Sequence, residues 1–400
     1  MGVSTQKVFI DSIANTVGTD FRTYKVVKRR QFTYVADTSR RGDRIGIALL
    51  ETHDEGLVSP IYTVFEIIGH DTLLPEYLMM WFRRPEFDRY ARFKSHGSVR
   101  ELFDWDEMCD VELPMPSIEK QREIVKEYHT IVERITLNER LNRKLEETAQ
   151  AIYKQWFVDF EFPISAKYAA AIGKPELEGQ PYKSSGGEMV FNEVLRLKIP
   201  AGWEDKALLD LTSKIGSGAT PAGGKESYLK SGISLVRSLN VFDYAFSYDG
   251  LAFIDKRQAA KLDNVVLQEG DVLINITGVS VARCCIVPAS ILPARVNQHV
   301  MIIRPKVEIS ISHYLLCLLC SSDYKQKLLG SSESGSTRQA LTKTEIETLS
   351  VLFPCKEILE IFEEKARAVF SYWDNLTHQN NTLNMVLQNL LSMLATSRLQ

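Results

Sequence analysis

A glycine-rich stretch at residues 216–226 is the first candidate for chemistry, because such loops often cradle phosphate groups. A nucleotide-binding loop of this kind needs a glycine six residues before its lysine and a serine or threonine directly after it. Ala219 stands six residues before Lys225, and Glu226 stands where the magnesium-binding hydroxyl would be. The stretch therefore predicts no nucleotide site. It fits a loop whose backbone approaches a DNA backbone, or an ordinary tight turn.

The cysteines and histidines give no metal or nucleophilic site. Cys317 and Cys320 have a metal-like spacing, but no second pair and no set of histidines accompanies them. They lie in an apolar run, which predicts packing inside a buried helix. The six cysteines show no disulfide-like pattern, which favours a reduced, cytoplasmic protein. The seven histidines are scattered along the chain.

Signatures of a self-sufficient enzyme are missing from the sequence. It lacks the Asn/Asp-Pro-Pro-aromatic tetrapeptide and the glycine-rich methyl-donor loop of adenine methyltransferases, and no catalytic triad can be assembled. We therefore expect no catalytic residues, no metal and no cofactor. No apolar run reaches membrane-spanning length, so we expect no membrane partner.

Cations are concentrated in two places on a chain whose net charge is −3. Residues 22–44 hold eight cations against two acids, and residues 83–100 hold six against two. One interpretation is a solvated surface. The other is a DNA-binding face on a protein whose partners supply further phosphate contacts.

The elements that would position these residues are duplicated at an offset of about 238 residues. Gly97–Arg100 has its counterpart in Gly335–Arg338, and Pro116 has its counterpart in Pro354. Each proline is followed by a long helical pattern, and each helical pattern is preceded by a mixture of strand-like and helical runs. The chain is therefore expected to be a doubled unit.

Both long helical patterns place core-type residues at alternating steps of four and three, the a and d positions of a coiled coil. The first series is Ile124, Tyr128, Ile131, Ile135, Asn138, Asn142, Leu145, Ala149, Ile152 and Trp156, and the second is Phe362, Ala366, Val369, Trp373, Leu376, Asn380, Leu383, Leu387, Leu390 and Leu394. A lone helix of this kind is unstable in water, so we expect the two copies to pair antiparallel. Asn142 and Asn380 occupy the same position and would either fix the register or lie where the seam is hydrated.

The predicted fold class is α+β, with two α/β domains joined by two long antiparallel helices in a pseudo-twofold repeat. Domain 1 is expected at residues 1–116 and domain 2 at residues 190–355. The central helix is expected at 117–160 and the distal helix at 356–400, with a polar linker at 161–189.

Several motifs resemble the specificity (S) subunits of type I restriction–modification systems. The most specific are those at the start and the end of the central helix, Leu113–Val125 and Leu145–Phe160. Others follow in the order usual for the family's second target-recognition domain: Ile199–Trp203, Gly216–Pro221, Thr277-Gly278, Asn297-Gln298 and Gly335–Thr337. Domain 1 has no opening like Gly202-Trp203, so the two domains are expected to differ at their edges.

The resemblance implies a non-catalytic DNA-recognition protein. Each target-recognition domain would read one half of a bipartite site on double-stranded DNA. The helices would set the spacer and dock two methyltransferase subunits, and restriction subunits would join through the complex. A coiled-coil scaffold and a stand-alone nucleic-acid-modifying enzyme are the alternatives.

Side chains of the types that read base edges or phosphates are the candidates for DNA contact. In domain 1 they are Lys28, Arg29, Arg30, Arg40, Arg41, Arg44, His96 and Arg100, and in domain 2 they are Ser217, Thr220, Lys225, Arg237, Asn240, Gln298 and Arg338. Each of them could instead be structural or face a phosphate.

Overall fold

The computed structural model describes residues 1–11, 20–38, 44–69, 71–97, 101–221, 223–333 and 340–395. The chain divides into two compact units. Unit 1 combines Met1–Glu139 with Thr377–Gln400, and unit 2 is Arg140–Leu376. Unit 1 contains domain 1 and the ends of both long helices that pack with it, whereas unit 2 contains domain 2 and the remaining parts of those helices.

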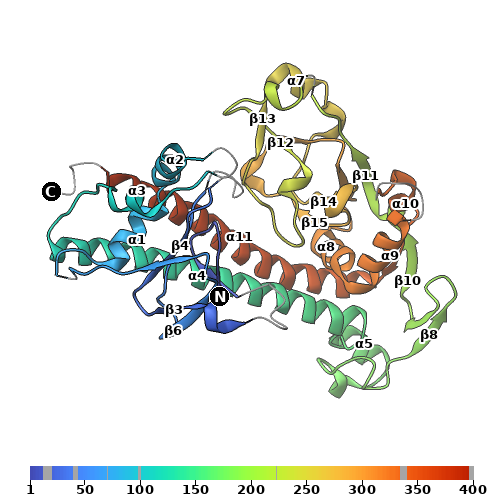
Figure 1. Ribbon diagram of the computed structural model, residues 1–400. Helices are drawn as coiled ribbons and strands as arrows, with labels where there is room; N and C mark the ends of the chain where they lie inside the picture. Colours follow the sequence, from blue (N-terminus) through green and yellow to red (C-terminus); the bar gives the residue numbers. More distant parts are fainter. Residues whose placement is uncertain are drawn as a thin grey trace. The chain divides into compact units, whose positions relative to one another are not determined.

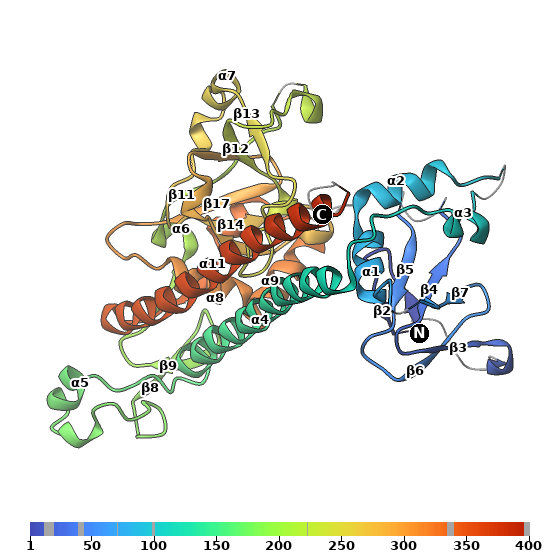
Figure 2. The ribbon, with the colours of Figure 1, turned by 90° about the vertical axis from the view of Figure 1, so that its left-hand side faces the viewer.

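Unit 1 is built on a three-stranded antiparallel sheet of order β5-β4-β7, with helix α1 packed on β5 (Figure 2). The bounds are β4 Phe32–Val35, β5 Gly46–Leu49, β7 Thr63–Phe65 and α1 Pro75–Arg83. All residues of β4 and β5 are buried, as expected for strands covered on both faces. Two small sheets complete the unit: β1 Gly2–Val3 with β2 Phe9–Ile10, and β3 Lys25–Lys28 with β6 Glu55–Val58.

The helical stretch of residues 76–93 is divided into α1 and α2 (Pro85–Phe93). The break has a covalent cause, because proline at position 85 excludes the helical conformation at the residue before it. Arg84 accordingly takes an extended conformation, with ψ near 137°. The two short helices can therefore pack separate faces against the sheet.

Unit 2 contains a four-stranded sheet of order β11-β17-β14-β15, with α8 packed on β15 and β14 (Figure 1). The bounds are β11 Thr212–Ser217, β14 Val272–Asn275, β15 Cys284–Ile286, β17 Val300–Pro305 and α8 Ser312–Cys320. A second sheet has the order β13-β12-β16, with β12 Ile233–Val236, β13 Ala252–Ile254 and β16 Ala294–Val296. Two antiparallel pairs are added: the hairpin of β8 Met189–Asn192 with β9 Leu197–Pro200, and β10 Glu204–Ala207 with β18 Ser350–Phe353, which is distant in sequence.

The two units repeat one core in the same chain order. Strands β5, β4 and β7 correspond to β15, β14 and β17, because each set forms consecutive antiparallel neighbours in the same order. The helices that follow also correspond: α1 with α8, α2 with α9 Ser322–Glu333, and α3 Trp105–Cys109 with α10 Lys343–Glu347. Even a capping bond recurs, since the Asp104 and Thr342 side chains each accept a hydrogen bond from the backbone three residues ahead. The internal duplication is therefore structural.

The two long helices are α4 (Ile118–Phe157) and α11 (Lys356–Met393). They pack together in both units, and every residue of the two predicted seams is buried or half-buried. In unit 1 the early part of α4, at Ile124 and Tyr128, clusters with the end of α11 at Leu391. In unit 2 the end of α4 meets the start of α11, where the Trp156 and Phe362 rings lie 6.0 Å apart. The helices therefore run antiparallel, which confirms the predicted α+β class with two paired long helices.

A pair of asparagines fixes the register of this seam in unit 1. The Asn138 amide donates to the Asn380 side-chain oxygen at 2.8 Å and to Gln379 at 2.7 Å. Asn380 donates in turn to the Ile135 carbonyl at 3.4 Å. Asn380 is buried, as a register-fixing residue must be. The residue that faces it is Asn138 rather than its repeat counterpart Asn142, because antiparallel pairing joins positions that the repeat does not equate.

The stretch predicted as a linker is folded in unit 2. It contains α5 (Ala166–Ala171) and the short turn η2 (Pro175–Leu177). The Phe162 ring stacks on Tyr182 at 4.6 Å and on Trp203 at 4.9 Å, and Ala169 is buried beside them. Aromatic burial therefore holds the stretch against the opening strand of domain 2.

Cys317 is buried and Cys320 is half-buried against the apolar core of unit 2, both on α8, in agreement with the prediction of packing within a helix. Cys284 and Cys285 are also buried. Across the part of the chain that the structure describes, no His, Cys, Asp and Glu side chains gather as a metal site. Within the same described residues, no helix is both long and apolar enough to cross a membrane.

Candidate nucleic-acid interface

The same loop edge appears in both domains, beyond the central strand of the shared core. In domain 1 the backbone N–H of Phe103 donates to the Ala36 carbonyl at 2.9 Å, and Asp37 forms a bridge with Leu102. In domain 2 the N–H of Leu341 donates to the Ile276 carbonyl at 2.8 Å, and Thr277 forms a bridge with Ala340. Each bridge brings the loop after the central strand to the stretch that follows the Gly97–Arg100 or Gly335–Arg338 motif. This edge is our candidate DNA-binding surface.

On domain 1 the candidate cations fall in two places: Arg44 lies near the loop edge, whereas Lys28, Arg29 and Arg30 lie at the opposite end of β4. The Arg29 guanidinium lies 3.1 Å from Asp54, and that of Arg30 lies 3.3 Å from Glu76. Lys28 and Arg44 are exposed. Ion pairs at a surface contribute little stability, so these side chains can exchange a carboxylate for a phosphate at small cost.

The second group of cations lies close to two acids on domain 1. The Arg92 guanidinium contacts Glu101 at 2.5 Å, and Lys94 contacts Glu107 at 3.0 Å. The hydrogen bond that Lys94 donates to Glu107 raises the pKa of the lysine. His96 is exposed and lies 3.7 Å from the same Glu107. Arg40, Arg41 and Arg100, which were also predicted to contact DNA, lie outside the described residues.

On domain 2 four polar side chains form one hydrogen-bonded array along the edge. The Thr220 hydroxyl donates to the Gln298 carbonyl oxygen, and the Gln298 amide nitrogen lies 2.9 Å from His299 Nε2. His299 Nδ1 lies 2.6 Å from the Thr277 hydroxyl. Both ring nitrogens of His299 therefore face a polar side chain. We call Thr220, Gln298, His299 and Thr277 the polar array.

Close backbone approach between two loops makes the polar array possible. The N–H of Gly218 donates to the Asn297 carbonyl at 3.1 Å. A Cβ on Gly218 would lie 1.9 Å from the Val296 carbonyl oxygen, so only glycine fits. Ser217, another candidate, is the last residue of β11 and pairs with Met301. The glycine-rich stretch therefore serves as a close-packed loop that places Thr220 beside Gln298.

Two further candidates in domain 2 organise their own loop. Asn240 is fully buried; its amide donates to the Ser247 and Asp249 carbonyls, and its oxygen accepts from the N–H of Arg237 at 3.0 Å. The Arg237 guanidinium lies 5.1 Å from the centre of the Tyr228 ring and donates to the Gly250 carbonyl. Both side chains therefore make their contacts within domain 2 itself. Lys225 lies in the short turn η3 (Gly224–Ser227), and Arg338 lies outside the described residues.

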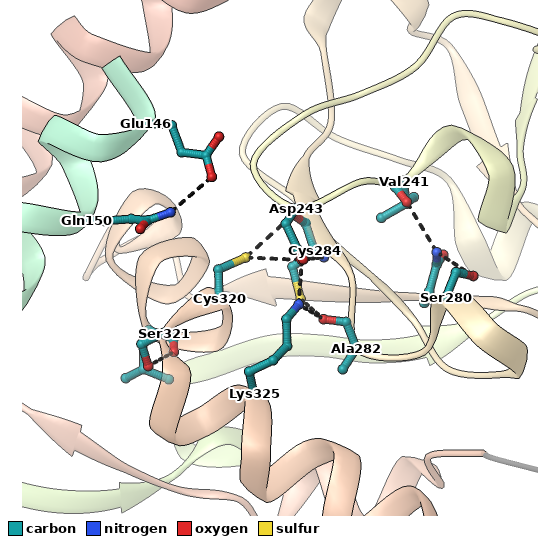
Figure 3. Close-up of polar contacts among 12 residues, drawn as sticks. Glu146, Gln150, Val241, Asp243, Ser280, Ala282, Cys284, Cys320, Ser321 and Lys325 are labelled. Atoms are coloured by element: carbon teal, nitrogen blue, oxygen red, sulfur yellow. Dashed lines mark hydrogen bonds and ion pairs between the residues drawn. The ribbon is translucent and has the colours of Figure 1, made fainter. Parts of the chain in front are cut away.

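The turn that carries Ser280 and Ala282 is anchored by Lys325 (Figure 3). Lys325, on α9, donates to the Ala282 carbonyl at 2.5 Å and pairs with Asp243 at 2.5 Å. Asn275 is fully buried, and its amide donates to the Ser238 carbonyl at 2.9 Å and to the Ser280 hydroxyl at 3.2 Å. These bonds hold residues 276–283 in one conformation.

Carboxylates and thiols surround this anchor inside unit 2. Burial raises the pKa of Glu146, and the nearby charge of Asp243 raises it further. Burial likewise raises the pKa of the Cys320 thiol well above its ordinary value. A thiol of this kind is a poor nucleophile. The cluster in Figure 3 therefore supports the loop and offers no catalytic cysteine.

Three residues that matter at this edge were not among the sequence-based candidates. In the sequence, His299 is one of seven scattered histidines, and Thr277 belongs to a family-like motif without being a candidate for DNA contact. Lys325 had no assigned role. No local pattern identifies them, because their contacts depend on the pairing of β14 with β17 and on the packing of α9.

Comparisons with known proteins agree on one family. No family model matches the chain. It is 26% identical over 337 residues to the type I restriction enzyme MjaIX specificity subunit of Methanocaldococcus jannaschii. That match covers 84% of this chain and 71% of the relative. It is 24% identical over 386 residues to the type I restriction enzyme HindI specificity subunit of Haemophilus influenzae, which covers 85% of this chain and 81% of that protein.

A solved structure shares the fold. The type I restriction–modification S subunit from M. genitalium matches with a TM-score of 0.56 and 12% identity. The match covers 98% of this chain and 89% of that one.

Proposed function

We propose a function for this chain from its place among the specificity subunits of type I restriction–modification systems. It recognises DNA sequence without catalysing a reaction. Domain 1 reads one half of a bipartite site on double-stranded DNA, and domain 2 reads the other half. The protein acts in the cytoplasm and needs no cofactor of its own.

The observation that carries the proposal is the repeated loop edge. Two domains with one core place non-equivalent side chains at equivalent loops, which is what reading two different half-sites requires. Arg44 and His96 supply phosphate contacts from the edge of domain 1, with Arg40, Arg41 and Arg100 as further candidates. Lys28, Arg29 and Arg30, at the opposite end of β4, supply phosphate contacts away from that edge. Thr220, Gln298 and Ser217 supply hydrogen-bonding groups from domain 2, joined by Lys225 and Arg338. Arg237 and Asn240 shape the loop beside them.

The paired helices complete the proposal. They set the spacer between the half-sites and dock two methyltransferase subunits, which carry the methyl donor and the chemistry. Restriction subunits join through that complex. Sharing of phosphate contacts with those partners accounts for a DNA-recognition protein whose own net charge is −3.

The test measures binding to a duplex whose sequence comes from mapping methylated adenines in cells that carry the system. Fluorescence anisotropy would compare the chain assembled with its methyltransferase subunits, the methyltransferase subunits alone, and the chain alone. We expect sequence-specific binding only when the chain is present in the assembly. Equal binding by the methyltransferase subunits alone would overturn the proposal in favour of a scaffold. Methylation or cleavage by the chain alone, with methyl donor, ATP and magnesium, would overturn it in favour of an enzyme.

A further inference from the structure

Val279 is an apolar side chain that stands fully exposed at the recognition edge of domain 2. It lies in the short turn η6 (Gly278–Ser280), two residues after Thr277 of the polar array. A single exposed apolar residue on a protein surface needs no explanation in itself. Its place among the hydrogen-bonding groups of a proposed DNA-reading edge is what makes it informative.

The turn presents Val279 in a fixed position. Gly278 has a φ of +76°, which a glycine adopts without strain. The N–H of Val281 donates to the Gly278 carbonyl at 3.0 Å, and that of Ala282 donates to the Asn275 carbonyl at 2.8 Å. On one side Thr277 is held by His299, and on the other Ser280 is held by the buried amide of Asn275. A rigid turn loses little conformational freedom when it binds.

The chemistry of the side chain selects its ligand. In the major groove each base pair shows hydrogen-bond donors and acceptors, and thymine alone of the four ordinary bases adds an apolar methyl group. Valine can neither donate nor accept a hydrogen bond, and its branched Cβ restricts it to few rotamers. A fixed, protruding valine beside polar groups therefore matches a thymine and disfavours the polar edge of cytosine at the same position.

We propose that Val279 contacts the C5-methyl group of a thymine in the half-site that domain 2 reads. The proposal rests on the proposed function, since it needs a DNA-reading edge at this place. It adds a specificity-determining residue of stated chemistry to that edge.

Replacement of thymine by uracil removes only the methyl group and so provides the test. The complete assembly of this chain with its methyltransferase subunits is titrated with target duplexes that carry uracil at one thymine position at a time. For the natural protein we expect one position in the domain 2 half-site at which uracil weakens binding about three- to fivefold, the effect of one buried methyl group. The Val279→Ala variant should bind the thymine and uracil duplexes equally at that position.

Val307→Ala is the matched control. Val307 is also highly exposed and lies just beyond β17, at the end of that strand opposite His299. This variant should keep the full sensitivity to uracil. The inference is overturned if no thymine position responds to uracil, or if Val279→Ala keeps the natural response. Failure of the natural assembly to bind any target duplex would instead overturn the proposed function itself.

Discussion

Domains 1 and 2 share a core but differ in what their equivalent loops carry. Beyond β4, domain 1 places Arg44 and its neighbours in the sequence, a run rich in fixed positive charge. Beyond β14, domain 2 places a turn tied to His299 and Lys325 by hydrogen bonds. Under the proposed function, one scaffold would therefore support two kinds of recognition. Charge gives affinity that depends on salt, whereas an ordered array of donors and acceptors gives discrimination between bases.

The domains also differ in how a long helix holds them. In unit 1 the side chain of Gln121, on α4, accepts from the N–H of Leu74 at 2.9 Å and donates to the Thr72 carbonyl at 2.8 Å. In unit 2 the carboxylate of Glu363, on α11, accepts from the N–H of Tyr314 at 2.7 Å and from His313 at 2.8 Å. Both residues are buried and satisfy the start of the equivalent helix, α1 or α8. A neutral amide in unit 1 and a carboxylate in unit 2 thus each accept a backbone hydrogen bond at the start of the equivalent helix.

The largest predicted change in stability tests this difference between the carboxylate of Glu363 and the neutral amide of Gln121. Glu363→Ala leaves the His313 ring and the Tyr314 N–H without their acceptor in a buried place, and should lower the free energy of unfolding by about 3–4 kcal/mol. Gln121→Ala breaks neutral hydrogen bonds only and should lower it by about 2 kcal/mol. Urea denaturation measures both. Glu364→Ala, an exposed neighbour, is the control and should change it by less than about 0.5 kcal/mol. Equal destabilisation by the Glu363 and Gln121 variants would contradict the distinction between charged and neutral capping.

The second prediction concerns DNA affinity and distinguishes charge-dependent binding by domain 1 from base discrimination by domain 2. Joint replacement of Lys28, Arg29, Arg30 and Arg44 by alanine should weaken DNA binding about 100-fold at physiological salt. The slope of log affinity against log salt should flatten by roughly one unit for each phosphate that the variant no longer neutralises. Titrations of the assembled complex at several salt concentrations measure this. An unchanged slope would remove these cations from the interface.

Domain 2 should respond in the opposite manner. Gln298→Ala breaks the polar array in the middle and should weaken binding to the target duplex about tenfold, the value of one good base contact. The salt dependence should stay as in the natural protein, because the substitution removes no charge. Binding to duplexes with one changed base pair in that half-site should change little. A large change in the salt slope would show that the array acts through phosphates.

The smallest effect lies in the helix seam. Asn138→Leu leaves the buried Asn380 oxygen without a donor and should lower the free energy of unfolding by about 1–2 kcal/mol. The double variant Asn138→Leu, Asn380→Leu should regain that stability or exceed it, because an apolar seam needs no such pair. Thermal unfolding measures both. A double variant whose destabilisation equals the sum of the two single variants would place the asparagines outside a shared contact.

The sequence predicts the long helices and the repeat better than it predicts the contacts of individual surface residues. The heptad positions from Ile124 to Trp156 recur strictly enough in the second half of the chain to predict both long helices and their pairing with each other. This works because a helix seam is a local periodic pattern. The same periodicity does not identify Asn138 as the partner of Asn380, because the repeat equates positions that antiparallel packing separates. Short strands such as β7 and the break at Arg84 depend on tertiary packing and on one proline.

The roles of the residues at the loop edge depend on contacts between residues that are distant in sequence. Asn240 and Gln298 both end in an amide group, yet Asn240 is fully buried and Gln298 lies exposed in the polar array. Residue type alone could not separate them. Gly218 looked like part of a flexible loop, whereas its role is to let two backbones approach within hydrogen-bonding distance.

The two-domain account is tested most directly by reading the motif that the system methylates. Methylated adenines are mapped by sequencing in cells with the natural chain, and again after residues 190–355 are replaced by the corresponding domain of a relative. The account predicts two short specified sequences separated by an unspecified spacer, of which the exchange alters one and preserves the other. A single continuous motif, or an exchange that alters both parts together, would contradict it.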